Sequence, residues 1–387
     1  MTAQTITLGC RLNFAESEAM AAGAPDGALI VNSCAVTSEA VRQTRQAIRR
    51  AYREQPQRPI IVTGCAAQLD PEAFRAMPEV AEVRLRDDAL PAVAAAGLIH
   101  QVKSFVAVQT GCDHRCTFCT IWTARGPSRS VAYEAVRDAV ERELARGAKE
   151  IVLTGVDITD YACPEPGRGA GGPGRLCQRL LGDVRGLERL RLSSLDSIEI
   201  DGALLELIAG EPRLMPHFHL SLQAGDDLVL KRMKRRHLRA DAVAVVAAIK
   251  AARPEATIGA DLIAGFPTES EAAALNTLAL LDDCDVVAAH IFPFSPRPGT
   301  PAARMPQVER ELVKARAARL RDHAAARRSD WLDSLIGSRQ RVLIENERGE
   351  GHGASNAPVR IAGAAKGDIL YAVITARDGN HLIGMSV

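Results

Sequence analysis

The sequence predicts an α/β protein built from an N-terminal open parallel sheet, a central partial (β/α)6 barrel and a small C-terminal antiparallel β domain. Three observations lead to this prediction. Apolar runs alternate with helical segments over most of the chain, a strongly charged helical stretch follows, and the final residues alternate as short strands do. At 387 residues the chain is too long for one ordinary core. We therefore expect segments at 1–100, 101–306, 307–335 and 336–387, of which the third is a connecting helix.

Composition excludes several classes of protein. The chain is 47% hydrophobic and 25% charged, as globular proteins are, and it has no apolar run of about 18 residues that could span a membrane. Residues 1–20 carry polar side chains every few positions, unlike a secretory signal. We expect a cytoplasmic protein with no membrane partner. The net charge of +1 gives the whole molecule no basic signature.

The first segment repeats one pattern three times. Each repeat is an apolar run that ends in Gly or Ser and then Cys: "ITLGC" at 6–10, "ALIVNSC" at 28–34 and "PIIVTGC" at 59–65. A helical stretch from Ser38 to Arg53, with Ser38 as the expected N-cap, separates the second and third runs. Strands that alternate with helices imply a parallel sheet.

In such a sheet Cys10, Cys34 and Cys65 follow the carboxyl ends of strands, at the edge where open α/β sheets bind ligands. Three thiols far apart in sequence would then lie near one another. The alternative is that each is a small buried residue at a strand end, since free cysteine is often buried. Recurrence of the same position three times favours the first interpretation.

The second segment carries six apolar runs that alternate with helices, and six parallel strands would curl into a partial barrel. One clear helix is expected from Ser130 to Arg146, with Ser130 as the N-cap. The runs, in order, are "FVAVQTG", "EIVLTG", "LRLSSL", "HFHLSL", "TIGADLIAGF" and "VVAAHIFPF".

A Gly- and Pro-rich stretch at 164–175 interrupts this series and is typical of a flexible surface insertion rather than a packed element. Cys163 and Cys177 flank it. We interpret both of them, and Cys284, as structural or incidental, because none has a partner at ligand spacing.

The stretch "GCDHRCTFC" at 111–119 places Cys112, Cys116 and Cys119 within eight positions. A zinc site would need a fourth ligand, for which His114 is the local candidate, on a strained loop. A disulfide would leave one thiol over, and a reducing compartment disfavours it. Three thiolates can instead bind three irons of a cubane cluster and leave the fourth iron open to a substrate or cofactor. The loop follows the first barrel strand, so it lies at the edge where such barrels keep their active sites.

Two regions are candidates for nucleic-acid binding. The basic run "KRMKRRHLR" at 231–239 lies on the active edge of the barrel, although a solvated helix face would have the same composition. The C-terminal β domain belongs to a class of small barrels that often bind nucleic acids. Its few cations and single aromatic residue, Tyr371, predict weak binding.

These features together resemble the methylthiotransferases of the radical S-adenosylmethionine (SAM) superfamily. The N-terminal three-cysteine segment, "CDHRCTFC", "HLSLQAGDDLVLKRMKR", "DLIAGFPTE", "FSPRPGTPAA" and a small terminal β domain, TRAM-like in this family, occur in family order. The resemblance implies a [4Fe-4S] cluster, the SAM-binding one, on Cys112, Cys116 and Cys119. It implies a second [4Fe-4S] cluster, which carries the sulfur, on Cys10, Cys34 and Cys65.

The resemblance also implies the SAM contacts. Phe118 would lie near the adenine, and the other contacts would be Asp157, Ser194, Gln223 and Arg235. Two departures from the family pattern stand near this site. The loop continues as "TIWTARG" where relatives commonly have an Ile-Pro pair, and the insertion at 167–174 lengthens a loop on the active edge.

The opening "TLGCRLNFAESEAM" is most similar to the branch that acts on threonylcarbamoyladenosine. That branch inserts a methylthio group at C2 of N6-threonylcarbamoyladenosine, at position 37 of tRNA. SAM serves as radical source and methyl donor. The implied partners are the tRNA anticodon loop, an electron donor such as a flavodoxin or ferredoxin, and a sulfur source. Alternatives are isopentenyladenosine in tRNA, a ribosomal-protein aspartate or, in another class, a nucleic-acid-binding iron-sulfur redox sensor.

Overall fold

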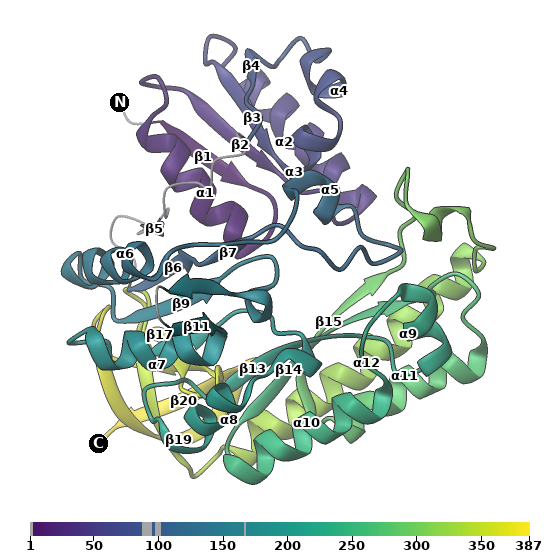
Figure 1. Ribbon diagram of the computed structural model, residues 1–387. Coiled ribbons are helices and arrows are strands. Elements are labelled where there is room, and N and C mark those ends of the chain that lie inside the picture. Colours follow the sequence, from purple (N-terminus) through teal and green to yellow (C-terminus); the bar gives the residue numbers. More distant parts are fainter. Residues whose placement is uncertain (1–2, 87–94, 97–101, 166–167) are drawn as a thin grey trace.

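The computed structural model describes residues 3–86, 95–96, 102–165 and 168–387. Its N-terminal part is an open sheet in which β1, β2, β3 and β4 pair in that order and in parallel, as the sequence predicted. Figure 1 shows this sheet and its helices above the rest of the molecule. The elements are β1 (Gln4–Thr7), α1 (Arg11–Ala22), β2 (Leu29–Ser33), α2 (Ser38–Glu54), β3 (Ile60–Gly64), α3 (Cys65–Leu69), α4 (Pro71–Arg75) and β4 (Glu82–Val83).

Helix α2 shows why the strands of this part are parallel. Every residue of β2 and β3 is buried, and α2 returns the chain between them with Thr44 and Ile48 facing inward. The expected N-cap was wrong by one residue. The cap is Thr37, whose hydroxyl accepts a hydrogen bond from the backbone of Ala40 at 3.1 Å. Ser38 is already helical, and its own hydroxyl bonds to Ser295 instead.

The central part contains the six parallel strands that the apolar runs predicted. They form two sheets, which isolated parallel bridges join at Leu190–Leu214 and Leu195–Leu220 into one partial barrel. The two-residue strand β5 (Ala95–Ala96) pairs antiparallel at the outer edge. The strands are β6 (Lys103–Ala107), β9 (Glu150–Thr154), β12 (Leu190–Leu192), β13 (His217–Gln223), β14 (Thr257–Ala264) and β15 (Val286–Pro293).

Helices cover the outside of the barrel, and the largest apolar core lies between them and the strands. The expected helix at 130–146 begins later, at Tyr133, because Ser130 belongs to a short strand that pairs with Gln109. The elements are β7 (Gln109–Thr110), α5 (Ile121–Arg125), β8 (Arg129–Ser130), α6 (Tyr133–Ala145), α7 (Pro173–Asp183), α8 (Gly202–Gly210), α9 (Asp227–Met233), α10 (Arg239–Ala252) and α11 (Glu271–Asp283).

The Gly- and Pro-rich insertion is more ordered in form than the sequence predicted. Strands β10 (Cys163–Glu165) and β11 (Arg168–Gly171) pair antiparallel, and Pro173 and Gly174 are buried at the start of α7. Residues 166–167 lie outside the described residues, as does the side chain of Cys163. Cys177 and Cys284 are buried free thiols, which agrees with a structural role.

The charged helix α12 (Arg310–Ser334) leads to a closed C-terminal barrel with the order β16-β17-β18-β20-β19. One pair departs from the antiparallel prediction, because β18 and β20 run parallel. In the described residues no helix has the length and hydropathy that a membrane crossing requires. The strands are β16 (Arg339–Ile344), β17 (Glu350–Gly353), β18 (Pro358–Ile361), β19 (Ile369–Asp378) and β20 (His381–Ser386).

The C-terminal barrel docks at the amino ends of the central strands, away from the thiols. Glu150, at the start of β9, accepts hydrogen bonds from Arg189 and Arg191 at 2.8 and 2.9 Å. These arginines reach the carbonyls of Gly353 and Ala354 in the C-terminal barrel at 3.5 and 3.3 Å. In Figure 1 the yellow strands accordingly lie on the opposite side of the central barrel from the N-terminal sheet.

Candidate active site

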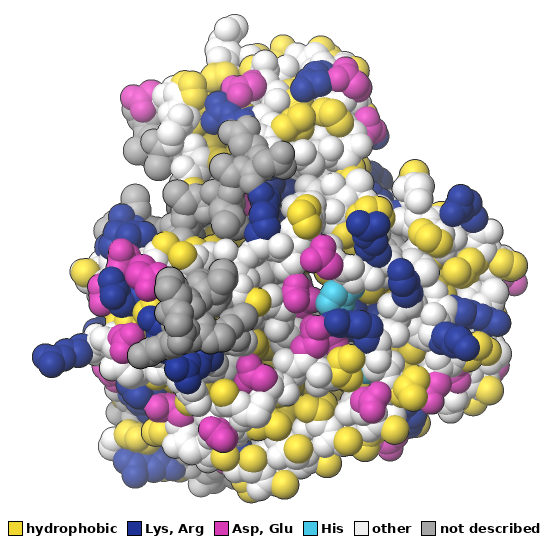
Figure 2. Space-filling model, viewed as in Figure 1, with side chains coloured by type: hydrophobic (Ala, Val, Ile, Leu, Met, Phe, Trp, Pro, Cys, Tyr) yellow, Lys and Arg dark blue, Asp and Glu magenta, His cyan; other side chains and the backbone are white. Residues whose placement is uncertain are grey.

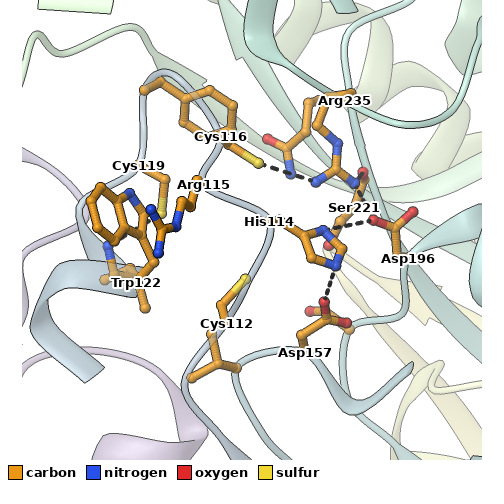
Figure 3. A pocket seen from close by; sticks show the side chains of 15 residues that line it. Cys112, His114, Arg115, Cys116, Cys119, Trp122, Asp157, Asp196, Ser221 and Arg235 are labelled. Carbon is orange, nitrogen blue, oxygen red and sulfur yellow. Dashed lines mark hydrogen bonds and ion pairs between the residues drawn. The ribbon is translucent and has the colours of Figure 1, made fainter. Parts of the chain in front are cut away.

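A cavity of about 150 Å³ opens at the carboxyl ends of the central strands. On the face drawn in Figure 2, acidic and basic side chains gather around a hollow below the N-terminal part. Figure 3 shows the side chains of the cavity converging from the loop and from several strands. The lining includes every loop cysteine and every SAM contact that the sequence analysis named: Cys112, Cys116, Cys119, Phe118, Asp157, Ser194, Gln223 and Arg235.

The loop that carries Cys112, Cys116 and Cys119 is held in a tight path. Gly111 has a φ of +77°, and a Cβ there would come 1.8 Å from the carbonyl oxygen of Pro127. The backbone N–H of Cys112 donates to the carbonyl of Gly126 at 3.1 Å, which ties the two ends of the loop together. Thr117 donates to the carbonyl of Arg232 at 2.8 Å and fixes the loop against α9.

Burial controls the protonation of the loop thiols. It raises the pKa of Cys112 to about 12 and that of Cys119 to about 11. Metal binding at these thiols must therefore displace protons. Arg235 Nη1 lies 3.7 Å from the sulfur of Cys116, so a positive charge stands beside the third thiol.

His114 also lines the cavity, and the sequence analysis considered it only as a zinc ligand. Its side chain is 9% exposed, and its Nε2 lies 3.0 Å from the Asp157 carboxylate. The hydrogen bond that His114 donates to the Asp157 carboxylate raises the pKa of His114 above its usual value. Arg236 approaches the same ring at 2.6 Å. The position of His114 between the first two cysteines was the sequence signal that it shares their cavity.

Asp196 was missed as well. It follows β12 at the active edge and binds Arg235 at 2.7 Å. Among the described residues, the buried Asp196 Oδ1 and Arg235 Nε have no hydrogen-bond partner. Buried polar atoms of this kind are normally satisfied, so this cavity suits a polar ligand. The residues present thus fit the amino and carboxylate groups of SAM, beside three thiols that fit an iron-sulfur cluster.

One side of the cavity is apolar. Phe118 packs edge to face against Phe266 with ring centroids 6.5 Å apart, and Phe266 packs in the same way against Phe294 at 5.5 Å. These rings belong to a buried cluster that also contains Ile263. Such a wall suits the face of an adenine ring.

The structure also brings together the three N-terminal cysteines. Cys34 directly follows β2 and Cys65 directly follows β3, while Cys10 precedes α1. A Cβ on Gly9 would lie 3.3 Å from the Cβ of Cys34, so this glycine lets the chain beside Cys10 approach the second strand end. Burial raises the pKa of Cys34 to about 11, and the neighbouring Cys65 and Cys10 thiolates add to the rise.

A buried ion-pair network joins this N-terminal triad to the loop triad. Arg125, at the end of α5, binds Glu16 of α1 at 2.7 and 3.1 Å and Asn13 at 2.8 Å. Arg86 binds the same carboxylate at 2.7 Å and lies 3.6 Å from the sulfur of Cys65. Burial alone would raise the pKa of Cys65, but these two arginines outweigh it and hold that pKa below its usual value.

Helix α5 is the physical link between the two triads. It begins two residues after Cys119, and Ile121 and Ala124 pack into the core of the N-terminal sheet. Helix α5 also contacts α3, which begins at Cys65, so the chain that follows Cys119 lies against the chain at Cys65. Helix α5 contains most of the stretch "TIWTARG" that departs from the family pattern.

The fold and the site define the class. The profile of the Radical SAM superfamily matches residues 106–281, and that of the Uncharacterized protein family UPF0004 matches residues 2–85. In structure, the chain resembles the radical S-adenosylmethionine methyltransferase TsrM from Kitasatospora setae, with a TM-score of 0.52 and 13% identity over 78% of this chain and 77% of that one. This likeness supports the fold.

Sequence relatives define the family more closely. The threonylcarbamoyladenosine tRNA methylthiotransferase MtaB of Rickettsia prowazekii is 41% identical over 89% of this chain and 87% of its own length. The MtaB of Thermotoga maritima is 33% identical over 89% and 86%. A tRNA-2-methylthio-N(6)-dimethylallyladenosine synthase from Maricaulis maris is 29% identical over 98% and 95%. The chain belongs to the radical SAM methylthiotransferase family.

Proposed function

We propose that the protein is a tRNA methylthiotransferase that inserts a methylthio group at C2 of N6-threonylcarbamoyladenosine, at position 37 of tRNA. The observation that carries this proposal is the approach of two thiol triads at one edge, linked by α5. One triad suits radical generation and the other suits sulfur delivery. The names of the MtaB relatives support the choice of base.

The cofactors follow from the chemistry of the donors. When bound, the clusters and SAM supply the radical that removes hydrogen from C2, the sulfur and the methyl group. Reduction requires a low-potential electron donor such as a flavodoxin or ferredoxin, and turnover requires a sulfur source. We expect these partners in the cytoplasm. The residues that would hold the SAM-binding cluster are Cys112, Cys116 and Cys119, and those for the second cluster are Cys10, Cys34 and Cys65.

The chain's own residues bind and orient the ligand. Arg235 and Asp196 present the unsatisfied polar atoms that orient a zwitterionic ligand, and Phe118 closes the apolar side. Ile121 and Trp122 of α5 line the cavity, and Ile121 also packs on the core of the N-terminal sheet, so α5 forms the wall between the two.

A basic cleft beside the N-terminal triad suits the RNA backbone. This cleft, of about 830 Å³, is lined by Arg42, Arg45 and Arg49 of α2 and by Arg297, with Asp70 as the single acidic residue of its described lining. The Nε atoms of Arg45 and Arg297 are buried and have no partner among the described residues. Arg42 pairs with Glu39 and Arg49 lies 3.9 Å from Glu79, but both side chains stay exposed, and exposed guanidinium groups are well suited to phosphate oxygens.

The basic run at 231–239 is less suited to RNA than its sequence suggested. Arg232 binds Thr268 at 2.7 Å, Arg235 serves the cavity, and Arg239 pairs with Asp283. Lys231 and Lys234 are exposed, so they remain candidates for phosphate contact. We therefore place the main phosphate contacts in the α2 cleft.

Mass spectrometry of tRNA nucleosides tests the function. We expect 2-methylthio-N6-threonylcarbamoyladenosine after incubation of the reconstituted protein with SAM, reductant and tRNA that carries threonylcarbamoyladenosine. A product on isopentenyladenosine, or on a ribosomal protein, would transfer the protein to another branch. A redox sensor would hold iron but form no 5′-deoxyadenosine.

A further inference from the structure

Two histidines and an aspartate form a cluster inside the barrel that the steps above do not use. His219 Nε2 lies 2.9 Å and His290 Nδ1 lies 3.0 Å from the same carboxylate oxygen, Asp261 Oδ1. The two imidazole rings are tilted by 36° to each other, with centroids 4.8 Å apart. The three residues stand on the neighbouring strands β13, β14 and β15, where Asp261 is the register partner of His290.

This cluster faces the same side of the sheet as the SAM cavity. Along β13 the buried residues Phe218, Leu220 and Leu222 alternate with His219, Ser221 and Gln223. Ser221 and Gln223 line the cavity, so the side chain of His219 lies on the cavity face of the same strand.

A glycine makes room for the cluster. Gly259 is the register partner of His219 on β14, and a Cβ there would come 2.4 Å from His219 Nδ1. Any other residue at 259 would push the ring away from Asp261. The local sequence is therefore suited to holding this ring in place.

The cluster leaves one polar atom available to a ligand. The side chain of His290 is 66% exposed, and in the described part of the chain Asp261 is its single hydrogen-bond partner. Burial would raise the pKa of Asp261, but the hydrogen bonds from His219 and His290 hold it well below its usual value. Asp261 is thus an ionised group that fixes His290 Nδ1 as a donor, which leaves Nε2 for a bound molecule.

We propose that His219, Asp261 and His290 form the subsite that receives the polar N6 substituent of the substrate base, with His290 as an imidazolium that donates from Nδ1 to Asp261 and from Nε2 to the carboxylate of the substituent. The proposal rests on the proposed function. A threonylcarbamoyl group carries a carboxylate, a hydroxyl and amide N–H groups, whereas a dimethylallyl group carries only carbon and hydrogen. Polar donors and acceptors in a binding site discriminate between these two groups. An apolar substituent would leave the polar atoms of the site without hydrogen-bond partners.

The same three ligand atoms lie within 4.8 Å of one another, which would also suit a metal ion. The surroundings favour the substrate instead. Histidines that bind metals normally donate their second nitrogen to a carboxylate or carbonyl, and within the described residues His290 has no such second partner.

The test measures affinity for three anticodon stem-loop RNAs that carry threonylcarbamoyladenosine, dimethylallyladenosine or unmodified adenosine at position 37. The reconstituted full chain should prefer the first RNA. His290→Leu should reduce that preference by about tenfold, the effect of one lost charge-assisted hydrogen bond. His290→Gln, which keeps a donor near Nε2, should retain part of it. A matched control is His323→Leu. His323 of α12 also pairs with an aspartate, Asp282 of α11, at 2.9 Å, but this pair lies outside the barrel.

The outcomes separate the two proposals. If the unaltered protein does not prefer the threonylcarbamoyl RNA and does not modify it, the proposed function is wrong. If it shows the preference and both His290→Leu and Asp261→Asn keep it at normal iron content, the function stands and this inference is wrong. One equivalent of zinc or another divalent metal that disappears in His290→Leu would show a metal centre and also overturn the inference.

Discussion

The two cysteine triads differ in how the fold assembles them. Cys112, Cys116 and Cys119 lie on one short loop, so their approach depends on local geometry such as the positive φ of Gly111. The N-terminal thiols come from the ends of separate elements, and they meet only because the sheet has the order β1-β2-β3. The loop triad should therefore keep its geometry when other parts of the chain change. The N-terminal triad should form only when the whole N-terminal sheet is folded.

Thiols of the two triads also differ in the charge beside them. The Cys112 thiol has a carboxylate, Asp157, near it, which adds to the effect of burial on its pKa. Cys65 has Arg125 and Arg86, which hold its pKa down. Positive charge beside Cys65 favours an anionic ligand at that thiol, and Arg235 places a similar charge beside Cys116 in the loop triad. The electrostatic difference therefore distinguishes Cys65 from Cys112 rather than one whole triad from the other.

The largest expected effect comes from removing one triad at a time. Replacing the loop cysteines by alanine should reduce iron from about eight to about four per chain and abolish 5′-deoxyadenosine formation. Replacing the N-terminal cysteines should remove the same amount of iron but leave SAM cleavage in place while methylthiolation is lost. Iron analysis and chromatography of the two products measure these outcomes.

Two results would contradict the separate roles of the two triads. Full iron content in the protein without the N-terminal cysteines would make those residues structural. Methylthiolation by the same protein would mean that sulfur reaches the base without a second cluster. The variant Cys177→Ala is the matched control, since that thiol is buried far from ligand partners in the α7 core and should alter neither measurement.

The next effect concerns the ion pair between the triads. Arg125→Met should lower the free energy of unfolding by about 3 kcal/mol, because among the described residues Glu16 then keeps Arg86 as its single ionic partner. Urea titration of the iron-free protein measures this change. Arg50→Met is the control, because the Arg50–Glu54 pair is exposed and its loss should leave the free energy of unfolding nearly unchanged. Equal losses of unfolding free energy in the two variants would show that water solvates the Glu16 carboxylate as well as Arg125 does.

The contrast between local and long-range contacts also explains how much of this site the sequence could predict. The loop triad was predictable from spacing, and the strand-end triad from three repeats of one pattern. The Arg125–Glu16 pair was not, because it joins residues 109 positions apart through the packing of α5 on α1. His219, Asp261 and His290 were likewise invisible, since each alone reads as an ordinary polar residue in a strand. Parallel pairing in the correct register creates the cluster.

A smaller effect distinguishes the two basic surfaces, one beside each triad. Each cation that contacts RNA phosphate contributes about 0.7 to the slope of log affinity against log salt. Arg45→Ala with Arg49→Ala, in the cleft beside the N-terminal triad, should flatten the slope by about 1.4. Lys231→Ala with Lys234→Ala, beside the loop triad, should flatten it by less than about 0.7. The reverse order in a tRNA salt titration would move the main contacts to α9.

The smallest effect tests how each triad is supported by the helix that follows it. Thr37 caps α2, three residues after Cys34, by accepting from the Ala40 backbone at 3.1 Å. Thr120 is the corresponding N-cap residue of α5, but its side chain makes no capping hydrogen bond. Thr37→Ala should therefore cost about 1 kcal/mol of unfolding free energy, whereas the missing cap makes the matched Thr120→Ala change smaller. Urea titration of the iron-free variants measures both, and equal costs would mean that the N-terminal triad gains no support from its helix cap.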